Sequence, residues 1–323
     1  WVRYFMDRHL VVLFICSNMH VLWVVLLAGF VGVFGDDIFD AESCGSSFYN
    51  ETIRRPSLAR LREFPWLVRL GYQKSPDVAP EFHFHGTLIH RYYAVTTVFA
   101  ADYLGKSLKF VRLGDYHTSD EKDCQEFDGE EICAPSPQDI PVLYVVKHPE
   151  QNRPRMSHDL VVVKFQQPAD LTTEYVKPIC LPSPNLPLSE DAPLFLSAWC
   201  GSVKTGISVV PRQYRMQLAP TAVCTEKLSP HISITLHESE FCAALDLPKD
   251  STLPKEVSLR GSTGAPLQML DRTGKRFQLV GMTSVGVKNA ARDVPYVFTN
   301  VLQLSDWLRS TVDREEQKRA GRL

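Results

Sequence analysis

An excess of charge of either sign is missing from this 323-residue sequence. It carries 35 Lys and Arg against 37 Asp and Glu, for a formal net charge of -2. Such a balanced chain offers no broad basic field to hold nucleic acid or an anionic membrane. The sequence also lacks any repeat of 20 to 50 residues, which excludes solenoids and propeller arrays. Its partners are therefore expected to be proteins or small molecules, and no cofactor is expected.

Short β-rich runs punctuated by Pro, Gly and Asp follow Phe64, among them "WLVRLGY", "YYAVTTV" and "LVVVKF". This spacing favours an all-β sandwich or barrel over alternating βαβ units. The Pro-rich segment 166–193 is expected to cross between two halves. A helix is predicted near the end of the chain from residues at helical spacing: Leu304, Trp307, Leu308 and Thr311. Beyond it, a charged tail over 311–323 is expected to be solvated.

The first 35 residues are far more apolar than the rest. The run from Val21 to Phe34 is typical of a cleavable secretory signal, which we predict over 19–35 with residues 1–18 as an over-long start. The alternative is an uncut signal anchor from Leu10 to Phe34, which is long enough to span a bilayer. Polar residues inside that run favour the signal. Under both interpretations the rest of the chain faces an oxidising compartment, and a secreted, extracellular protein is expected.

Cysteine usage fits an oxidising compartment. Cys16 lies in the leader, and seven cysteines remain: Cys44, Cys124, Cys133, Cys180, Cys200, Cys224 and Cys242. An odd set in a secreted chain predicts disulfides and one leftover thiol, although spacing alone leaves the pairing open. Asn50 begins the sequon "NET" and is a predicted N-glycosylation site.

Seven blocks now follow one another in a recognisable order: "EFPWLVRLGY", "GTLIHRYYAVTT", "VRLGDYHTSDEKDC", "CAPSPQDI", "SHDLVVVKF", "VKPICLPS" and "PYVFTNVLQLSDWL". In this order they resemble the secreted chymotrypsin-like serine proteases, specifically the arthropod clip-domain type, from about Cys44 to Ser310. The clip module itself is not expected, because few residues separate the predicted cleavage from Cys44. The resemblance implies a double six-stranded β-barrel over 53–310 with a C-terminal helix, preceded by a connecting segment, 36–52.

Three disulfides are implied by the same resemblance: Cys44–Cys180, Cys124–Cys133 and Cys224–Cys242. Cys200 is then left over, and we favour a buried free thiol over an interchain bridge. Two further family bridges are missing, each at both ends. Phe84 and Ala100 occupy one pair of positions, and Leu259 and the Asn289–Ala290 region occupy the other. Paired loss with apolar replacement indicates a fold that still packs.

The catalytic positions of the family are changed one after another. "TTVFA" matches the general-base block and places Phe99 at the histidine, and a phenyl ring accepts no proton. "LRGSTGAPLQ" matches the nucleophile loop and places Thr263 at the serine, while Gly261 keeps an oxyanion-type amide. Asp159 matches the orienting aspartate but has no imidazole to orient, so a structural acceptor is expected. Losing nucleophile or base costs about 10⁶ in turnover in a comparable hydrolase, so the resemblance implies an inactive homologue rather than an enzyme.

Activation and specificity positions are changed as well. Ile53, preceded by Thr52, matches the activation site, which a trypsin-like protease would not cut. Ser262 replaces the acid that would meet the new amino terminus. Val257 stands where trypsin-like members carry the aspartate of the specificity pocket. The switch from zymogen to enzyme is therefore expected to be inoperative.

Other groupings of polar residues are weaker. "FHFH" is expected to place His83 and His85 on one strand face, with His90 nearby, but no further ligand completes a zinc set and no metal is predicted. His158 could replace the missing base, yet strand alternation should turn it away from Thr263 if Asp159 points inward. The acidic loop 120–131 could bind calcium or dock a basic partner, although such a charge run is usually a solvated face.

The family resemblance implies a secreted binding cofactor or modulator of an extracellular protease cascade in melanisation or innate immunity. Clip-domain proteases or prophenoloxidase-type zymogens are the expected partners, and a membrane is expected only if the leader is uncut. A binding protein for pathogen or matrix surfaces and a residual hydrolase using Thr263 are the alternatives. Nicking in a loop after Arg54, Arg60 or Arg62 could regulate binding.

Overall fold

The computed structural model describes part of the chain: residues 6–7, 10–11, 39, 43–47, 57–183, 186–189, 191–201, 206–246, 259–287 and 293–323. It divides into two units, 1–37 and 38–323. In the first unit, β1 (Met6–Asp7) pairs antiparallel with β2 (Leu10–Val11). The predicted signal, 19–35, and the sequon at Asn50 lie outside the described residues.

Six antiparallel strands close into a first barrel, in the neighbour order β10 (Gln138–Lys147), β11 (Val161–Phe165), β6 (Tyr93–Thr96), β5 (Glu81–His90), β4 (Leu67–Tyr72) and β7 (Leu108–Leu113). β6 and β11 are buried along their whole length, as their β-branched and apolar sequences predict. Closure leaves no strand edge unpaired around this barrel.

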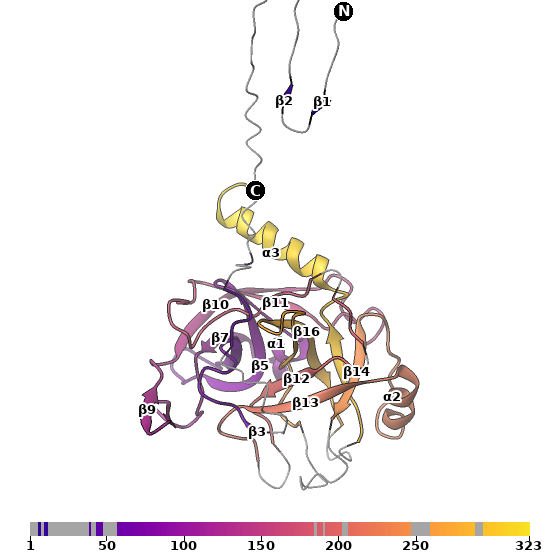
Figure 1. The fold of residues 1–323 in the computed structure, drawn as a ribbon, viewed down its shortest axis with the longest axis horizontal. Helices are drawn as coiled ribbons and strands as arrows, with labels where there is room; N and C mark the ends of the chain where they lie inside the picture. Colours follow the sequence, from indigo (N-terminus) through magenta and orange to yellow (C-terminus); the bar gives the residue numbers. More distant parts are fainter. Residues whose placement is uncertain are drawn as a thin grey trace, which may run out of the picture. The chain divides into compact units, whose positions relative to one another are not determined.

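A second set of strands forms another barrel, in the order β12 (Leu194–Ala198), β15 (Pro266–Leu270), β16 (Phe277–Val285), β17 (Tyr296–Asn300), β14 (Glu240–Leu245) and β13 (Arg212–Ala219). Pairing of β12 with β13 closes it, and β3 (Ser57–Leu58) adds to the outer side of β13. Figure 1 shows the two barrels beside each other, the first in indigo to magenta and the second in orange to yellow. The predicted double six-stranded barrel is confirmed, with 166–193 crossing between its halves.

A buried hydrogen bond ties the two barrels together. The Nε1 of Trp66, at the start of the first barrel, donates to Oε1 of Gln268 in β15 at 2.8 Å. Trp66 is fully buried, and its ring packs against Phe277 of β16 at 5.5 Å between centroids. The two barrels therefore share one hydrophobic core.

The remaining elements are short. They are α1 (Val98–Ala101), the 3₁₀ turn η1 (Tyr103–Gly105), the hairpin of β8 (Cys124–Phe127) and β9 (Glu130–Cys133), and α2 (Thr221–Leu228). The three implied disulfides are all formed: Cys44–Cys180, Cys124–Cys133 and Cys224–Cys242. Cys200 is the free cysteine of the described part, and it is fully buried. Burial raises the pKa of its thiol to about 12, so it behaves as a small apolar side chain.

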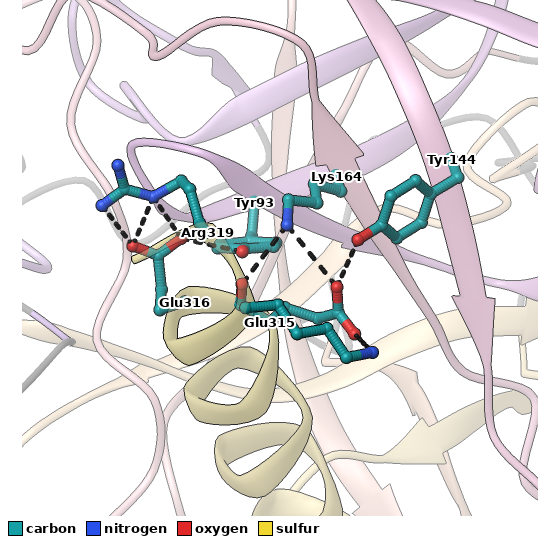
Figure 2. Close-up of polar contacts among 7 residues, drawn as sticks. Tyr93, Tyr144, Lys164, Glu315, Glu316 and Arg319 are labelled. Atoms are coloured by element: carbon teal, nitrogen blue, oxygen red, sulfur yellow. Dashed lines mark hydrogen bonds and ion pairs between the residues drawn. The ribbon is translucent and has the colours of Figure 1, made fainter. Parts of the chain in front are cut away.

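The C-terminal helix, α3 (Ser305–Arg319), is longer than the sequence predicts. The expectation that 311–323 is a solvated tail is wrong for Thr311, Val312 and Glu315, which are buried in α3, whereas residues 318–323 are exposed. Figure 2 shows the cause: the ammonium of Lys164 and the hydroxyl of Tyr144, on β11 and β10, meet the Glu315 carboxylate. The Glu315 carboxylate is therefore buried against partners distant in sequence, although the sequence around it is typical of a solvated charge run.

Candidate functional site

An open cleft of about 520 Å³ lies where the two barrels meet, and it holds all three residues predicted to match a catalytic triad. Val98, Phe99 and Asp159 line the cleft on the side of the first barrel. Thr263 and the end of β16 line it on the side of the second barrel. The structure therefore brings together the three residues that the sequence pointed to. What the cleft can do depends on their contacts.

Phe99 presents a hydrocarbon surface to this cleft. It sits in α1, whose first turn is capped by the Thr97 hydroxyl oxygen accepting from the Ala100 amide at 3.3 Å. The residue is 53% exposed. The ring packs edge-on against Phe84 at 5.5 Å and Tyr103 at 6.1 Å. The position expected to carry a proton acceptor is thus the exposed edge of an aromatic cluster, with no lone pair to offer.

Asp159 is occupied by structural hydrogen bonds. Its Oδ1 accepts from the Val98 amide at 2.7 Å, and its Oδ2 accepts from the Ser284 hydroxyl at 2.5 Å. Burial raises the pKa of this carboxyl, which the two hydrogen bonds partly offset. The aspartate therefore fixes α1 against β16, as the structural acceptor that the sequence predicts.

The nucleophile loop is fastened to both barrels. The Thr263 carbonyl accepts from the His85 amide at 3.0 Å, and the Gly264 amide donates to the Thr283 carbonyl at 2.8 Å. Gly264 has φ +78°, and a Cβ there would lie 2.1 Å from the His85 carbonyl oxygen. Ser262 is 2% exposed and carries no charge. The loop thus holds its shape through backbone contacts, without the ion pair that the family uses.

His85 supports this loop but cannot act as its base. The ring is fully buried and stacks on Trp199 at 5.6 Å, and its Nε2 accepts from the Trp199 amide at 3.0 Å. Burial, with the nearby Arg69 charge, lowers the pKa of His85 to about 3. A ring that is neutral and already engaged through Nε2 is a packing element, not a proton acceptor for Thr263.

The expectation that "FHFH" puts two histidines on one face is wrong. Phe84 has φ +52° and forms a bulge, so that His85 pairs with Arg69 while His83 pairs with Leu70. The extra residue reverses the alternation. His83 is therefore exposed beside Glu81, whereas His85 is buried.

His90 lies in a different environment from both His83 and His85. It packs against Tyr93, and burial lowers the pKa of its ring to about 4. The three histidines weighed for zinc thus occupy three separate environments.

His158 also lies apart from Thr263, although for a reason other than the one expected. It precedes β11 and has φ +53°, so strand alternation does not govern its direction. Its ring stacks on His148 at 4.7 Å, and its Nε2 lies 3.4 Å from a Glu150 carboxylate oxygen. Sequence reasoning missed this grouping, and its signal is "HPE" followed by "SHD" across a short loop.

The acidic loop 120–131 is a hairpin whose turn, Asp128–Gly129, has positive φ at both residues. Asp123 differs from its neighbours because it is buried, and its carboxylate accepts from the Tyr116 and His117 amides, both at 2.8 Å. One expected surface carboxylate is therefore a turn anchor. Calcium binding and docking by the others stay predictions.

The expected accessible cut after Arg60 does not fit the fold. The Arg60 amide donates to the Glu63 carboxylate at 2.6 Å, and the Leu61 amide donates to Oε1 of Gln125 at 2.8 Å. Leu61 is 2% exposed, so this bond lies in a tied, partly buried turn. The predicted activation site at Ile53, the bond after Arg54 and the pocket position Val257 lie outside the described residues.

The Trypsin family model matches residues 57–308. The chain is 28% identical over 261 residues to CLIP domain-containing serine protease B9 of Anopheles gambiae, covering 79% of this chain and 61% of that protein. It is 28% identical over 292 residues to the Spaetzle-processing enzyme of Drosophila melanogaster, covering 86% and 70%. It is 26% identical over 260 residues to phenoloxidase-activating factor 1 of Holotrichia diomphalia, covering 77% and 67%.

A solved structure gives the same fold. The Drosophila Grass clip serine protease of the Toll pathway superposes with a TM-score of 0.68 at 22% identity, covering 86% of this chain and 77% of that chain. Among the residues that the structure describes, no helix is long and apolar enough to cross a membrane.

Proposed function

The chain belongs to the trypsin family, and from that premise we propose that it is a secreted, non-catalytic member that binds proteins of an extracellular protease cascade. One observation carries the proposal. Phe99 presents an exposed aromatic edge in the cleft where the reaction needs a base, while the cleft itself stays open. An open cleft with a phenyl ring at the predicted position of the base is suited to binding rather than turnover.

The contacts around Thr263 support the absence of chemistry. A threonine hydroxyl is a weak nucleophile until a base takes its proton. The histidines weighed for this role are engaged elsewhere, His85 with Trp199 and His158 with His148 and Glu150. The two carboxylate oxygens of Asp159 accept hydrogen bonds from the Val98 amide and the Ser284 hydroxyl. Peptide hydrolysis would therefore proceed without general-base assistance.

The cleft surface supports a polypeptide ligand. Val98, Phe99, Met156 and Val285 give it an apolar lining, and Gln151, Asn152 and Ser284 add hydrogen-bonding groups. Apolar walls with a few placed polar groups are typical of ligand pockets, and an exposed aromatic side chain is the kind that anchors protein interfaces. An extended segment of a partner fits such a surface.

The names of the relatives indicate which kind of protein this chain would bind. The Holotrichia protein is a phenoloxidase-activating factor, and the Drosophila protein is a Spaetzle-processing enzyme. We propose that this chain works beside enzymes of that kind, as a cofactor or modulator for a clip-domain protease or a prophenoloxidase-type zymogen. Three disulfides support an oxidising, extracellular setting.

The absence of catalysis is tested with a fluorophosphonate probe, which labels activated serine-type nucleophiles. The purified chain, its Thr263→Ala variant and active trypsin are treated alike. We expect the chain to label no more than the variant, while trypsin labels fully. Labelling that Thr263→Ala abolishes would establish the residual threonine hydrolase instead.

Binding is tested by affinity capture from the host's extracellular fluid before and after immune challenge, with mass spectrometry of the retained proteins. Phe99→Asp and Leu143→Asp form a matched pair, because the two residues are 53% and 50% exposed and, of the two, only Phe99 lines the cleft. We expect a cascade protease or zymogen to be retained by the unaltered chain and Leu143→Asp, and lost from Phe99→Asp. Retention of microbial or matrix components alone would favour the surface-binding alternative.

A further inference from the structure

A loop that borders the cleft carries a histidine near each end. His148 follows β10, His158 precedes β11, and Glu150 lies between them in sequence. One ligand atom from each of the three lies within 4.8 Å of the others. The loop is tied at its base by the His148 amide, which donates to the Leu160 carbonyl at 3.1 Å. Two imidazoles and a carboxylate therefore converge away from the triad positions.

The spacing of one pair matches a metal shell. The Nε2 of His158 and Oε2 of Glu150 are 3.4 Å apart. Zn–N and Zn–O bonds of about 2.0 to 2.1 Å in a tetrahedron place two ligand atoms roughly 3.4 Å from each other. The pair thus has the separation of two neighbouring ligands on one ion.

Neighbouring hydrogen bonds fix the tautomer of His158. The Ser157 hydroxyl donates its single proton to the Pro154 carbonyl at 2.6 Å. The 3.1 Å contact between Ser157 Oγ and His158 Nδ1 must therefore be donated by Nδ1. In the neutral ring the Nε2 lone pair then faces the carboxylate. A metal-binding histidine is commonly oriented in this way, by a hydrogen bond from its other nitrogen.

His148 supplies a second lone pair. Its Nδ1 accepts from the Glu150 amide at 3.2 Å, a long hydrogen bond that an ion can replace. Its ring is stacked on His158 at an interplanar angle of 20°, so ligation requires a turn about χ2.

The His158 backbone is held by another element. Its amide donates to Ser239 Oγ at 3.2 Å and to Oε1 of Glu240 at 3.1 Å, which fixes its positive φ. Glu150 is 68% exposed at the side chain, so an ion can reach the site from solvent. We infer that His148, Glu150 and His158 form a binding site for one divalent transition metal ion. Zn²⁺ is the expected occupant, with water as a fourth ligand, because two imidazoles and a carboxylate suit its preferences.

Such an ion would join the two ends of the loop. Gln151, Asn152 and Met156 belong to this loop and line the cleft. Holding its ends should fix the side of the cleft that a partner contacts. This consequence rests on the proposed function, whereas the metal site itself does not.

The site is tested by titrating ZnCl₂ into the full chain, free of any polyhistidine tag, in a calorimeter, with the absorption of bound Co²⁺ as a second readout. We expect one ion per chain. His158→Asn, which keeps a residue tolerant of positive φ, should weaken binding by at least about tenfold, and Ser157→Ala should also weaken it.

His83→Asn is the matched control, because His83 and Glu81 form a pair with the same 3.4 Å separation, and within the described part of the chain no third ligand joins them. It should leave affinity within about twofold. If His158→Asn fails to fold, Glu150→Gln at an exposed side chain decides the question. No saturable binding, or unchanged binding in both His158→Asn and Glu150→Gln, would overturn the site. Neither result depends on capture of a partner.

Discussion

The conformation of the predicted nucleophile loop requires glycine at position 264. We predict that Gly264→Ala destabilises the protein by roughly 3 kcal/mol or more, because a Cβ there would lie 2.1 Å from the His85 carbonyl oxygen at φ +78°. Gly129→Ala is the control. Its φ of +82° is similar but nothing lies within 4 Å of the added atom, so it should cost about 1 to 2 kcal/mol. Urea unfolding of both variants measures the difference, and equal losses would contradict the steric argument.

A second prediction at this scale concerns pH and His85. Burial lowers the pKa of His85 to about 3, whereas in the unfolded chain it is near 6.5. Between these values the unfolded state binds a proton that the folded state does not. The free energy of unfolding therefore falls as the pH falls through this window, by about 1.4 kcal/mol per pH unit from this group.

His85→Gln should remove that contribution, while its amide oxygen can still accept from the Trp199 amide. Denaturant titrations between pH 6 and 4 measure the slope. His90, whose pKa burial lowers to about 4, contributes in the same direction, so the double variant should flatten the curve further. An unchanged slope in His85→Gln would mean that His85 becomes protonated in the folded protein.

Single histidines were also where the sequence was least informative. The identity of His83 and His85 suggested a shared strand face, but the bulge at Phe84 depends on how β5 pairs with β4. His158 shows the same limit, because its contacts with His148 and Glu150 require the loop to return on itself. Residue types could be read from the chain, while their directions could not.

At the scale of elements, α3 depends on a buried pair with the first barrel. Burial alone would raise the pKa of Glu315, but hydrogen bonds from Lys318 and Tyr144 lower it and keep the carboxylate ionised. The side chains of Lys164 and Glu315 are 8% and 4% exposed. We predict that Glu315→Ala destabilises the protein by about 3 to 5 kcal/mol, because the buried Lys164 ammonium loses its carboxylate partner and keeps only the Glu315 carbonyl oxygen, at 3.3 Å.

Asp313→Ala tests whether this loss is specific to the buried face of the helix. Asp313 is exposed on α3 and accepts only from Gln317 in the hydrogen bonds described, so its loss should stay within about 0.5 kcal/mol. Combining Glu315→Leu with Lys164→Met should recover much of the stability lost in Glu315→Ala, because the unpaired charge is gone. Thermal and denaturant unfolding measure all three. No recovery in the double variant would assign the cost to packing rather than charge.

The sequence pattern was least informative about the second half of α3. Apolar spacing predicted the start of the helix, yet "DREEQKR" carries too much charge to indicate burial, so 311–323 was expected to be solvated. The structure buries Glu315 because Lys164 and Tyr144 reach it from β11 and β10 (Figure 2). Helical spacing is local information, while the partner of a buried charge lies elsewhere in the chain.

At the scale of the whole molecule, the order of sequence blocks was enough for the double barrel and the disulfide pairing. Both depend on the family resemblance, since cysteine spacing alone left the pairing open. The fold is more robust to substitution than the site, because a barrel needs alternating apolar residues whereas a triad needs particular atoms. Phe99, at the predicted position of the base, illustrates the difference: it packs on Phe84 and Tyr103, while a phenyl ring accepts no proton.

The last prediction concerns how disulfides hold this molecule. Cys44–Cys180 joins residues 136 apart in sequence, whereas Cys124–Cys133 joins residues 9 apart. Constraint of the unfolded chain grows with loop length, so removing the first bridge should cost about 5 kcal/mol and removing the second about 3 kcal/mol. Each bridge is removed by replacing both cysteines with serine, which leaves no free thiol to exchange. Denaturant unfolding under non-reducing conditions measures the two losses.

Local structure around each bridge bears on which of the two losses is larger. The segment around Cys44 is also held by backbone hydrogen bonds, from the Gly45 amide to the Pro178 carbonyl at 2.8 Å and from the Phe277 amide to the Gly45 carbonyl at 2.9 Å. These bonds remain possible in the serine pair, so the folded state keeps its geometry and the loss should arise from the unfolded state. A larger loss for Cys124→Ser with Cys133→Ser would instead mean that the acidic hairpin needs its bridge to form, since Glu126 lies directly opposite Glu131.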